Sequence, residues 1–151
     1  MTLEIRMLDP GDHAILDKVA PGVFDNSTDP TLVAQFLGDH RHHLAVAIDR
    51  DQVAGFASGV HYVHPDKPSE MWINEVGVAP SHQGRGLGKA IVQTLLQHAK
   101  RLDCREAWVL TDRSNHAAMR LYASAGGKEA PQDQVMFTFF FDRDDRISST
   151  G

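Results

Sequence analysis

The chain has 151 residues, of which 42% are hydrophobic, and this length suits one domain with little room for a second independent core. Its 15 lysines and arginines are outnumbered by 20 aspartates and glutamates, which gives a formal net charge of -5. A duplex nucleic-acid binder normally carries a basic excess that displaces counterions. The charge therefore argues against nucleic acid as a partner and favours a cationic substrate.

The single cysteine, Cys104, excludes an intrachain disulfide framework and a multi-cysteine zinc site, and it fits a reducing compartment. The first six residues lack the charged segment and apolar core of a secretory signal. The longest apolar runs are far shorter than the ~18 residues that cross a bilayer. We therefore expect a cytoplasmic protein without a membrane partner.

In chain order, the first expected elements are a short strand over 3–7 and a helix of roughly ten residues that ends near Pro21. Asp29 and Pro30 begin a second short helix, because Asp caps a helix and Pro fits its first turn. Apolar runs over 44–48 and 53–62, joined by a polar turn, predict a hairpin.

The second half begins with a strand over 71–78, which is followed by a glycine-rich turn at 84–88 and a long helix to about Leu102. A strand over 107–110, a helix over 115–125 and a last strand over 135–141 complete the pattern. Strands joined by both hairpins and helices predict an α/β domain with a mixed sheet over residues 1–141. A polar tail over 142–151 is expected to follow it.

The glycine-rich turn carries the clearest functional signal. Gly84, Gly86 and Gly88 alternate with other residues, and glycine lets a ligand approach the backbone closely. The first amides of a helix have no intrahelical partner and lie at the positive end of its dipole, so a phosphate group can bind there. Arg85 supplies a cation near the same position.

Two other phosphate-binding motifs fit this turn less well. A P-loop needs serine or threonine after its lysine, but Ala90 follows Lys89. The Gly-x-Gly-x-x-Gly spacing of a dinucleotide-binding turn is not met. A plain glycine-rich helix start remains the structural alternative.

Two motifs in the second half of the chain resemble one enzyme superfamily. Gln83-x-x-Gly86-x-Gly88, after the strand that ends Val76-Gly77-Val78-Ala79-Pro80, resembles the acyl-CoA signature of the GNAT superfamily of N-acetyltransferases. Asn115-x-x-Ala118-x-x-x-Tyr122-x-x-x-Gly126-Gly127 resembles its second block. The resemblance implies a central, mostly antiparallel sheet flanked by about four helices and splayed between the strand ending at Val78 and the strand over 107–110.

The resemblance also implies acetyl-CoA as co-substrate and no metal. The pantetheine arm would pair with backbone groups in the splayed region, and the pyrophosphate would lie on the amides of 83–88. Asn115 is either a cofactor contact or the cap of its helix. The positions implied to contact the cofactor are Val76, Val78, Gln83, Gly84, Arg85, Gly86, Leu87, Gly88, Lys89, Asn115, Ala118 and Tyr122.

Three groups are candidates for the chemistry of acetyl transfer to an amine. Glu75 is the candidate general base, because alternation along 72–78 points it away from the face of Val76 and Val78; a solvated strand carboxylate is the alternative. The backbone N–H of Val78 is the candidate oxyanion donor. Tyr122 matches the superfamily's general acid for the departing thiolate, and it also fits an aromatic core position.

Further segments, 44–55, 62–65, 109–112 and 134–137, are similar to aminoglycoside 3-N-acetyltransferases, which confer antibiotic resistance. Because such a substrate carries several ammonium groups, its site should present carboxylates, and the candidates are Glu75, Asp112, Asp25 and Asp133. The alternatives are a GNAT enzyme for another small amine, polyamine or peptide, and a non-catalytic acyl-CoA sensor. Asp29 before Pro30 is expected to be a cap.

The remaining chemistry-bearing residues carry weaker expectations. Cys104 has no catalytic partner nearby in sequence and is expected to be inert. His40-x-His42-His43 lacks a convincing set of further metal ligands, so a solvated loop is expected there. His61, His64, His82 and His116 have no assigned role. The apolar end 136–141 fits either a core strand or a homodimer interface.

Overall fold

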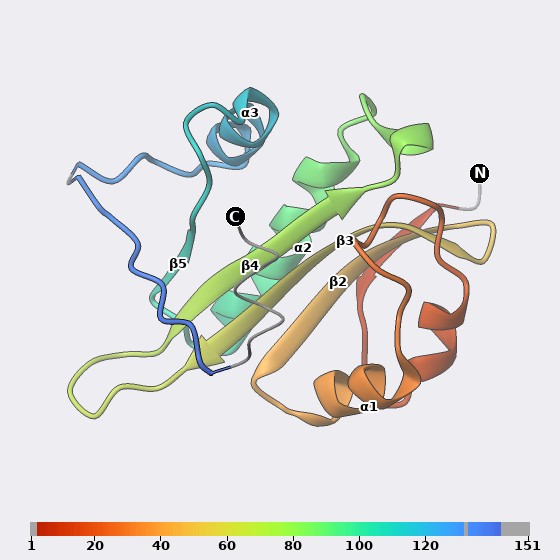
Figure 1. Cartoon of the computed structure of the whole chain (residues 1–151), viewed down its shortest axis with the longest axis horizontal. Coiled ribbons are helices and arrows are strands. Elements are labelled where there is room, and N and C mark those ends of the chain that lie inside the picture. The colour runs from red at the N-terminus through yellow and green to blue at the C-terminus, as the bar shows by residue number, and fades with distance from the viewer. Residues whose placement is uncertain (1–2, 132, 143–151) are drawn as a thin grey trace.

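The computed structural model describes residues 3–131 and 133–142, and in that part of the chain one mixed sheet organises the fold (Figure 1). Its strands lie side by side in chain order and are β1 (Glu4–Met7), β2 (His42–Asp49), β3 (Gln52–Tyr62), β4 (Glu70–Val78) and β5 (Glu106–Val109). The first three pairings are antiparallel and the β4–β5 pairing is parallel, as expected for strands joined by a helical crossover.

Helices cover both faces of this sheet. The helix α2 (Leu87–Arg101) packs behind the sheet in Figure 1, whereas α1 (Pro30–Gly38) and the 3-10 helix η1 (His13–Asp17) lie in front of it. A second 3-10 helix, η2 (Pro80–His82), follows β4, and α3 (His116–Ser124) lies beside the start of α2. The described residues thus hold three α-helices rather than the expected four or so.

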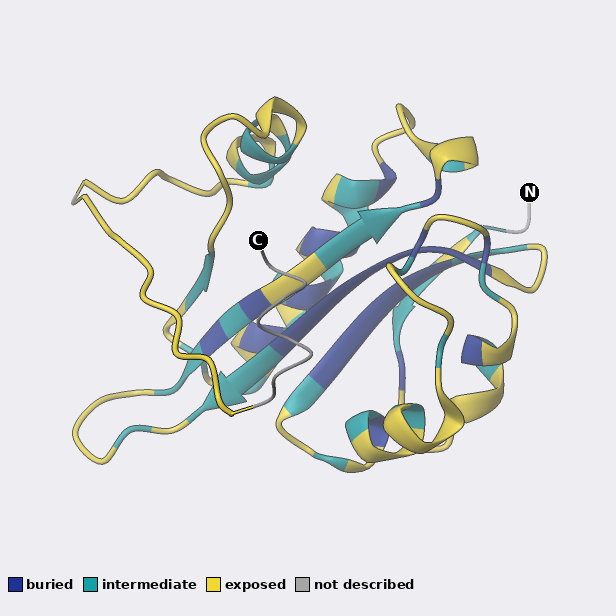
Figure 2. Cartoon of the chain, viewed as in Figure 1, coloured by how far each residue is buried: buried dark blue, intermediate teal, exposed yellow. Residues whose placement is uncertain are grey.

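The core consists of two apolar layers, one on each face of the sheet. Ala45 and Ala47 of β2 pack towards α2, whereas Leu44 and Val46 pack on the other face, as strand alternation requires. The inner face of α2 is fully buried, with Leu87, Ile91 and Leu95 at helical spacing. Figure 2 shows the continuous burial of β2 and β3, the central strands that hold the site in place.

The sheet is splayed between β4 and β5, as the family resemblance implies. Their parallel pairing runs from Glu70 opposite Glu106 to Ile73 opposite Val109 and then ends. Residues 74–78 continue along β3 alone, so their other edge faces a gap between the diverging strands. A β-bulge in β4 lies at the same point, since Glu75 pairs with Ser58 and Ile73 with Gly59, which leaves Asn74 unpaired.

The expected helix after the first strand is instead the five-residue 3-10 helix η1. The carboxylate of Asp12 accepts hydrogen bonds from the Asp9 amide at 2.7 Å and from Arg6 at 3.1 Å, so it does not cap the helix. Beyond Asp17 the chain extends along β3, where Val53 exchanges backbone hydrogen bonds with Lys18 and Ala20. This pairing with the sheet ends the helix early.

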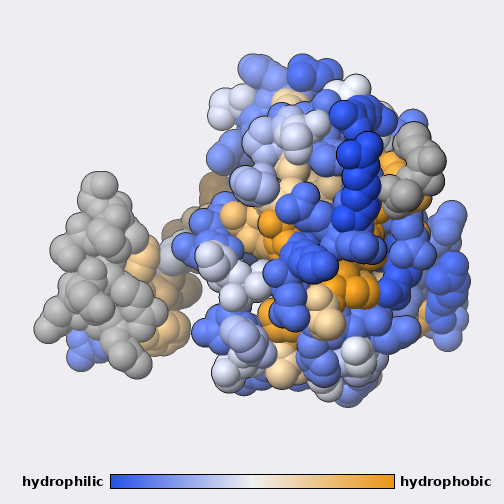
Figure 3. Space-filling model, turned by 90° about the vertical axis from the view of Figure 1, so that its right-hand side faces the viewer, coloured by the Kyte–Doolittle hydropathy of each residue, from blue (hydrophilic) through white to orange (hydrophobic). Residues whose placement is uncertain are grey.

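The expected last strand over 135–141 does not form. This segment makes no strand pairing with the described residues, and its large apolar side chains are 62% to 80% exposed. The segment that follows α3 runs in front of the sheet in Figure 1 and stands apart from the main body at the left of Figure 3. A strand needs a neighbouring backbone with which to exchange hydrogen bonds, and the described residues provide none for this segment. Residues 143–151 of the expected tail lie outside the described residues.

Among the described helices, none combines the length and apolar character needed to span a membrane.

Three histidines form a hydrogen-bonded chain between the sheet and the end of α2. His43 is 8% exposed, its Nε2 lies 2.7 Å from Nδ1 of His61, and its Nδ1 lies 3.1 Å from Nε2 of His98. Burial lowers the pKa of His43 to about 4 and also lowers the pKa of His61 and of His98. The expected solvated histidine loop is therefore wrong for His43, which is a core residue.

Acid should destabilise the fold through this chain of histidines. Because the pKa of His43 is lower in the folded state than in the unfolded state, unfolding takes up a proton below pH ~6.5, and stability falls as the pH decreases. We expect the free energy of unfolding to drop by about 2 kcal/mol from His43 between pH 7 and pH 5, measured by urea titration. H43Q should reduce this pH dependence, and H13Q at an exposed position should not; equal stability at both pH values would contradict the assignment.

Candidate functional site

The glycine-rich turn joins the splayed end of β4 to the first residue of α2. Gly84 and Gly86 adopt left-handed backbone angles, with φ of 80° and 76°, and Gly86 is the N-cap of α2. Only glycine adopts such angles without strain. A Cβ built at either position meets no atom within 4 Å, so the space in front of the turn is open.

The backbone amides of this turn lack protein acceptors. The Gln83 amide reaches the Pro80 carbonyl only at 3.5 Å, and the first bond of α2 runs from Ala90 N to Gly86 O at 3.2 Å. Between them, the amides of residues 84–89 donate to no acceptor within the described residues. A row of N–H groups at a helix N-terminus suits an anion such as a diphosphate.

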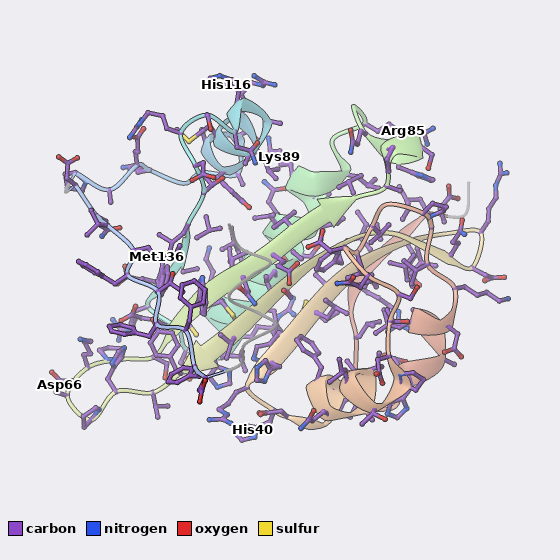
Figure 4. All side chains as sticks on the ribbon, viewed as in Figure 1. His40, Asp66, Arg85, Lys89, His116 and Met136 are labelled. Atoms are coloured by element: carbon purple, nitrogen blue, oxygen red, sulfur yellow. The ribbon has the colours of Figure 1, made fainter. Side chains whose placement is uncertain are left out.

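Two cations flank these amides. Arg85 is exposed, and its guanidinium has a single long contact, 3.5 Å from Nη2 to the Ser81 carbonyl. Figure 4 shows Arg85 beside η2 and Lys89 between the start of α2 and α3. Both side chains are therefore near enough to the turn to supplement its amides with charge.

The open edge of β4 directs backbone groups of Val76 and Val78 into the splay. Ala79 N donates to Ala54 O at 2.8 Å, and in an antiparallel pair hydrogen-bonded residues alternate with residues whose N–H and C=O point outward. Val78 and Val76 occupy the outward positions of this register. The side-chain amide of Gln83 donates to Val78 O at 3.1 Å, which agrees with that direction.

Glu75 is exposed and lies on the face of β4 opposite α2. Val76, Val78 and Ile73 all pack against the layer that contains α2. The side chain of Glu75 therefore points to the open face, beside the strand edge that carries the outward Val76 and Val78 groups. A carboxylate at this position is accessible to an incoming amine, so Glu75 stays a candidate base.

Tyr122 on α3 is half-buried against the layer that contains α2. Burial raises the pKa of its phenol, so the hydroxyl is protonated at neutral pH. The hydroxyl has no hydrogen-bond partner in residues 3–131 and 133–142. A Cβ added at Gly88 would lie 3.4 Å from Leu121, which shows that α3 packs directly on the first turn of α2.

Asn115 is the N-cap of α3, because its Oδ1 accepts the amide of Ala118 at 3.1 Å. The sequence left two roles open for Asn115, a cofactor contact or a helix cap, and the structure shows the cap. Ala118 is half-buried one turn before Tyr122. Because the Asn115 side-chain oxygen and the Ala118 amide are hydrogen-bonded to each other, a ligand at this position would contact other atoms of these two residues.

Apart from Glu75, the predicted substrate carboxylates are spread over three segments. Asp25 is exposed on a loop that packs over β4, where a Cβ added at Gly77 would lie 2.5 Å from Val23 O. Asp112 is exposed after β5, and Asp133 is exposed in the segment after α3. Only Asp25 therefore belongs to a loop that packs on the strand of Glu75.

An aromatic pair in the site was missed by the sequence reasoning. Trp72 of β4 lies opposite Trp108 of β5, with stacked rings whose centroids are 5.5 Å apart. Beside it, Trp108 Nε1 donates to the Tyr62 hydroxyl at 2.9 Å and to Glu70 at 3.1 Å. A signal for this pair is present in the sequence, since both tryptophans of the chain fall in the two strands that border the expected splay.

The other candidate residues have structural roles. His82 Nε2 lies 2.7 Å from Asp49, which ties η2 to the β2–β3 turn. His64 Nε2 lies 2.8 Å from Glu70. Burial raises the pKa of the Cys104 thiol, which disfavours the nucleophilic thiolate. Across the described residues, no group of three or more His, Cys, Asp or Glu side chains is arranged to hold a metal ion.

Comparisons with known proteins agree with this geometry. The chain is 38% identical over 79 residues to a mycothiol acetyltransferase of Kocuria rhizophila, a match that covers 52% of this chain and 26% of that protein. It is 28% identical over 104 residues to the N-alpha-acetyltransferase RimI of Mycobacterium tuberculosis, which covers 69% and 63% of the two chains. The chain thus spans about a quarter of the mycothiol acetyltransferases that it matches.

Among solved structures, the aminoglycoside N-acetyltransferase AAC(6')-Iy in complex with CoA superposes with a TM-score of 0.70 at 20% identity, over 91% of this chain and 94% of that chain. At this identity the similarity shows the shared fold. Residues 13–126 match the model of the acetyltransferase (GNAT) family. With its splayed sheet and glycine-rich turn, the chain belongs to the acetyltransferase (GNAT) family.

Proposed function

We propose that the protein is an acetyl-CoA-dependent N-acetyltransferase that acetylates a primary amine of an aminoglycoside, at the 3-N position. The observation that carries the acetyltransferase assignment is the run of amides without protein acceptors at residues 84–89, next to the open edge of β4. The aminoglycoside is supported by the exposed carboxylates of Glu75 and Asp25 and by the fold shared with an aminoglycoside acetyltransferase.

Residues of the turn and of β4 fit acetyl-CoA in two places. The amides of 84–89, with Arg85 and Lys89, are suited to a diphosphate, and the cradle is open because Gly84 and Gly86 have no side chains. The outward backbone groups of Val76 and Val78 are suited to the amides of a pantetheine arm. When bound, acetyl-CoA supplies an activated acetyl group as a thioester.

The chain's own groups would then move two protons and stabilise one charge. The carboxylate of Glu75 takes a proton from the ammonium of the acceptor, directly or through water. The N–H of Val78 donates to the carbonyl oxygen as negative charge develops on it. The Tyr122 hydroxyl, protonated at neutral pH, gives a proton to the departing thiolate and regains one as the nitrogen of the new amide loses its second proton.

A peptide N-terminus is a second candidate acceptor, because the similarity to RimI extends over 69% of this chain.

We further propose that two copies associate through the exposed apolar segment 135–141, a state that light scattering measures directly. A cytoplasmic location stays a prediction of the sequence.

The acceptor is identified by incubating the protein with acetyl-CoA and a panel of amines. Thiol release with an aminoglycoside, and mass spectrometry that places the acetyl group on the 3-amine, would support the proposal. Release with spermidine or a peptide alone would move the assignment to the other acceptors. Tight acetyl-CoA binding without release for any amine would indicate a sensor.

Substitution G86V should abolish acetyl-CoA binding. Valine is strained at a φ of 76°, and its side chain would fill the space in front of the amides. We expect the affinity measured by calorimetry to fall by at least about tenfold. G126V is the matched control, because Gly126 also has a positive φ of 102° and open space but lies beyond α3. Normal affinity in folded G86V would refute the turn as the binding site.

Substitution E75Q should lower kcat by about 10²- to 10⁴-fold, because the amide cannot accept the proton. The affinity of E75Q for acetyl-CoA should stay within a factor of about two to three of that of the unmodified protein. The proposed cofactor groups are the backbone groups of Val76 and Val78 on the edge of β4, and their side chains lie on the face opposite Glu75. Substitution E106Q removes another exposed strand carboxylate and serves as the control. A kcat for E75Q equal to that of the unmodified protein would remove Glu75 from the role of base.

A further inference from the structure

The two tryptophans form one stacked pair on the open face of the sheet. Trp72 and Trp108 are opposite each other in the β4–β5 register, and their rings are 5.5 Å apart and inclined by 11°. The strand neighbours of Trp72, Met71 and Ile73, are buried towards α2, so Trp72 points the other way, and Ala107 and Val109 beside Trp108 pack against the same layer. Both indoles are only partly buried.

This pair lies at the apex of the splay. It is one register position before Ile73 opposite Val109, where the pairing of β4 and β5 ends. The bulge at Asn74 then brings Glu75 onto the same face as Trp72, since Ile73 and Val76 both face α2. A nitrogen held at Glu75 therefore has the indole pair as its neighbour along the strand.

The two rings differ in how they are held. Trp108 is fixed through its Nε1 by the Tyr62 hydroxyl and by Glu70, and Glu70 is in turn bonded to His64 at 2.8 Å. Trp72 stacks on this fixed ring, but its own Nε1 donates to no acceptor in the described part of the chain. A partly buried indole normally finds a partner for its N–H, so Trp72 has a donor available for a ligand.

We propose that the Trp72–Trp108 pair is the wall of the acceptor site and that it selects an amine carried on a sugar ring. The C–H face of the ring packs on the indoles, a hydroxyl or ether oxygen accepts the Trp72 N–H, and the amine reaches Glu75. A wall that is already rigid before binding loses little entropy when the ligand arrives. This inference rests on the proposed function, since it assigns the acceptor of the same reaction.

Tryptophan fluorescence tests the inference independently of turnover. The chain has 2 tryptophans and both are in the pair, so all indole emission arises at this wall. With CoA in place of acetyl-CoA, no transfer occurs, and amines can be titrated. We expect saturable change in emission with the aminoglycoside sisomicin and none with spermidine or a tripeptide. No change with sisomicin, or an equal change with spermidine, would overturn the inference.

Kinetics of two variants at Trp72 complete the test. In W72A we expect the KM for the amino sugar to rise at least about tenfold, with kcat and acetyl-CoA affinity changed less than about threefold. W72F keeps an aromatic ring, so its KM for the amino sugar should be closer to that of the unmodified protein than the KM of W72A. This comparison separates loss of the ring contact from misfolding. An unchanged KM in W72A would overturn the wall. Absence of turnover with every amine would refute the proposed function, and the fluorescence titration would still decide the inference.

Discussion

The end of pairing between β4 and β5 is the constraint on which the rest of the site depends. After Ile73 and Val109 the strands separate, and the backbone groups of residues 74–78 on that edge lose their ladder partners. Such groups require another partner: the Val78 carbonyl accepts the side-chain amide of Gln83, and the others are left to water or a ligand. The gap therefore leaves a row of unpaired backbone groups along the edge of β4, beside the start of α2. The amides of 84–89 continue this row around the turn.

The bulge at Asn74 adds a second effect at the same point. Strict alternation would put Met71, Ile73 and Glu75 on one face, which would bury the carboxylate against α2. The extra residue changes the phase, so that Ile73 and Val76 pack together and Glu75 is exposed. The sequence contains this signal, because the apolar spacing changes from two to three residues between Ile73 and Val76. One inserted residue thereby places Glu75 on the face of β4 opposite Val76 and Val78.

Elements with local signals were predictable, and elements set by distant contacts were not. Asp29 and Pro30 define the start of α1 by themselves, and the spacing of Leu87, Ile91 and Leu95 defines the buried face of α2. In contrast, η1 is ended by pairing with Val53, which lies far along the chain, and no local pattern encodes that contact. The stacking of Trp72 on Trp108 likewise depends on the parallel register, which neither strand encodes alone. The segment 135–141 has the composition of a strand but lacks a neighbouring backbone.

The proposed site divides recognition between two kinds of group, and on this proposal family membership identifies acetyl-CoA but not the acceptor amine. The proposed cofactor groups are backbone groups, the amides of 84–89 and the edge of β4 at Val76 and Val78, which many sequences can supply provided that glycines keep the turn open. The proposed acceptor groups are side chains on the open face of β4 and β5, namely Glu75 and the indole pair. Proteins with this fold at about 20% identity can therefore share the first set and differ in the second. On this proposal the choice of amine depends on a few side chains of the open face, and the hydrogen-bonded Trp108 ring fixes the surface on which Trp72 stacks.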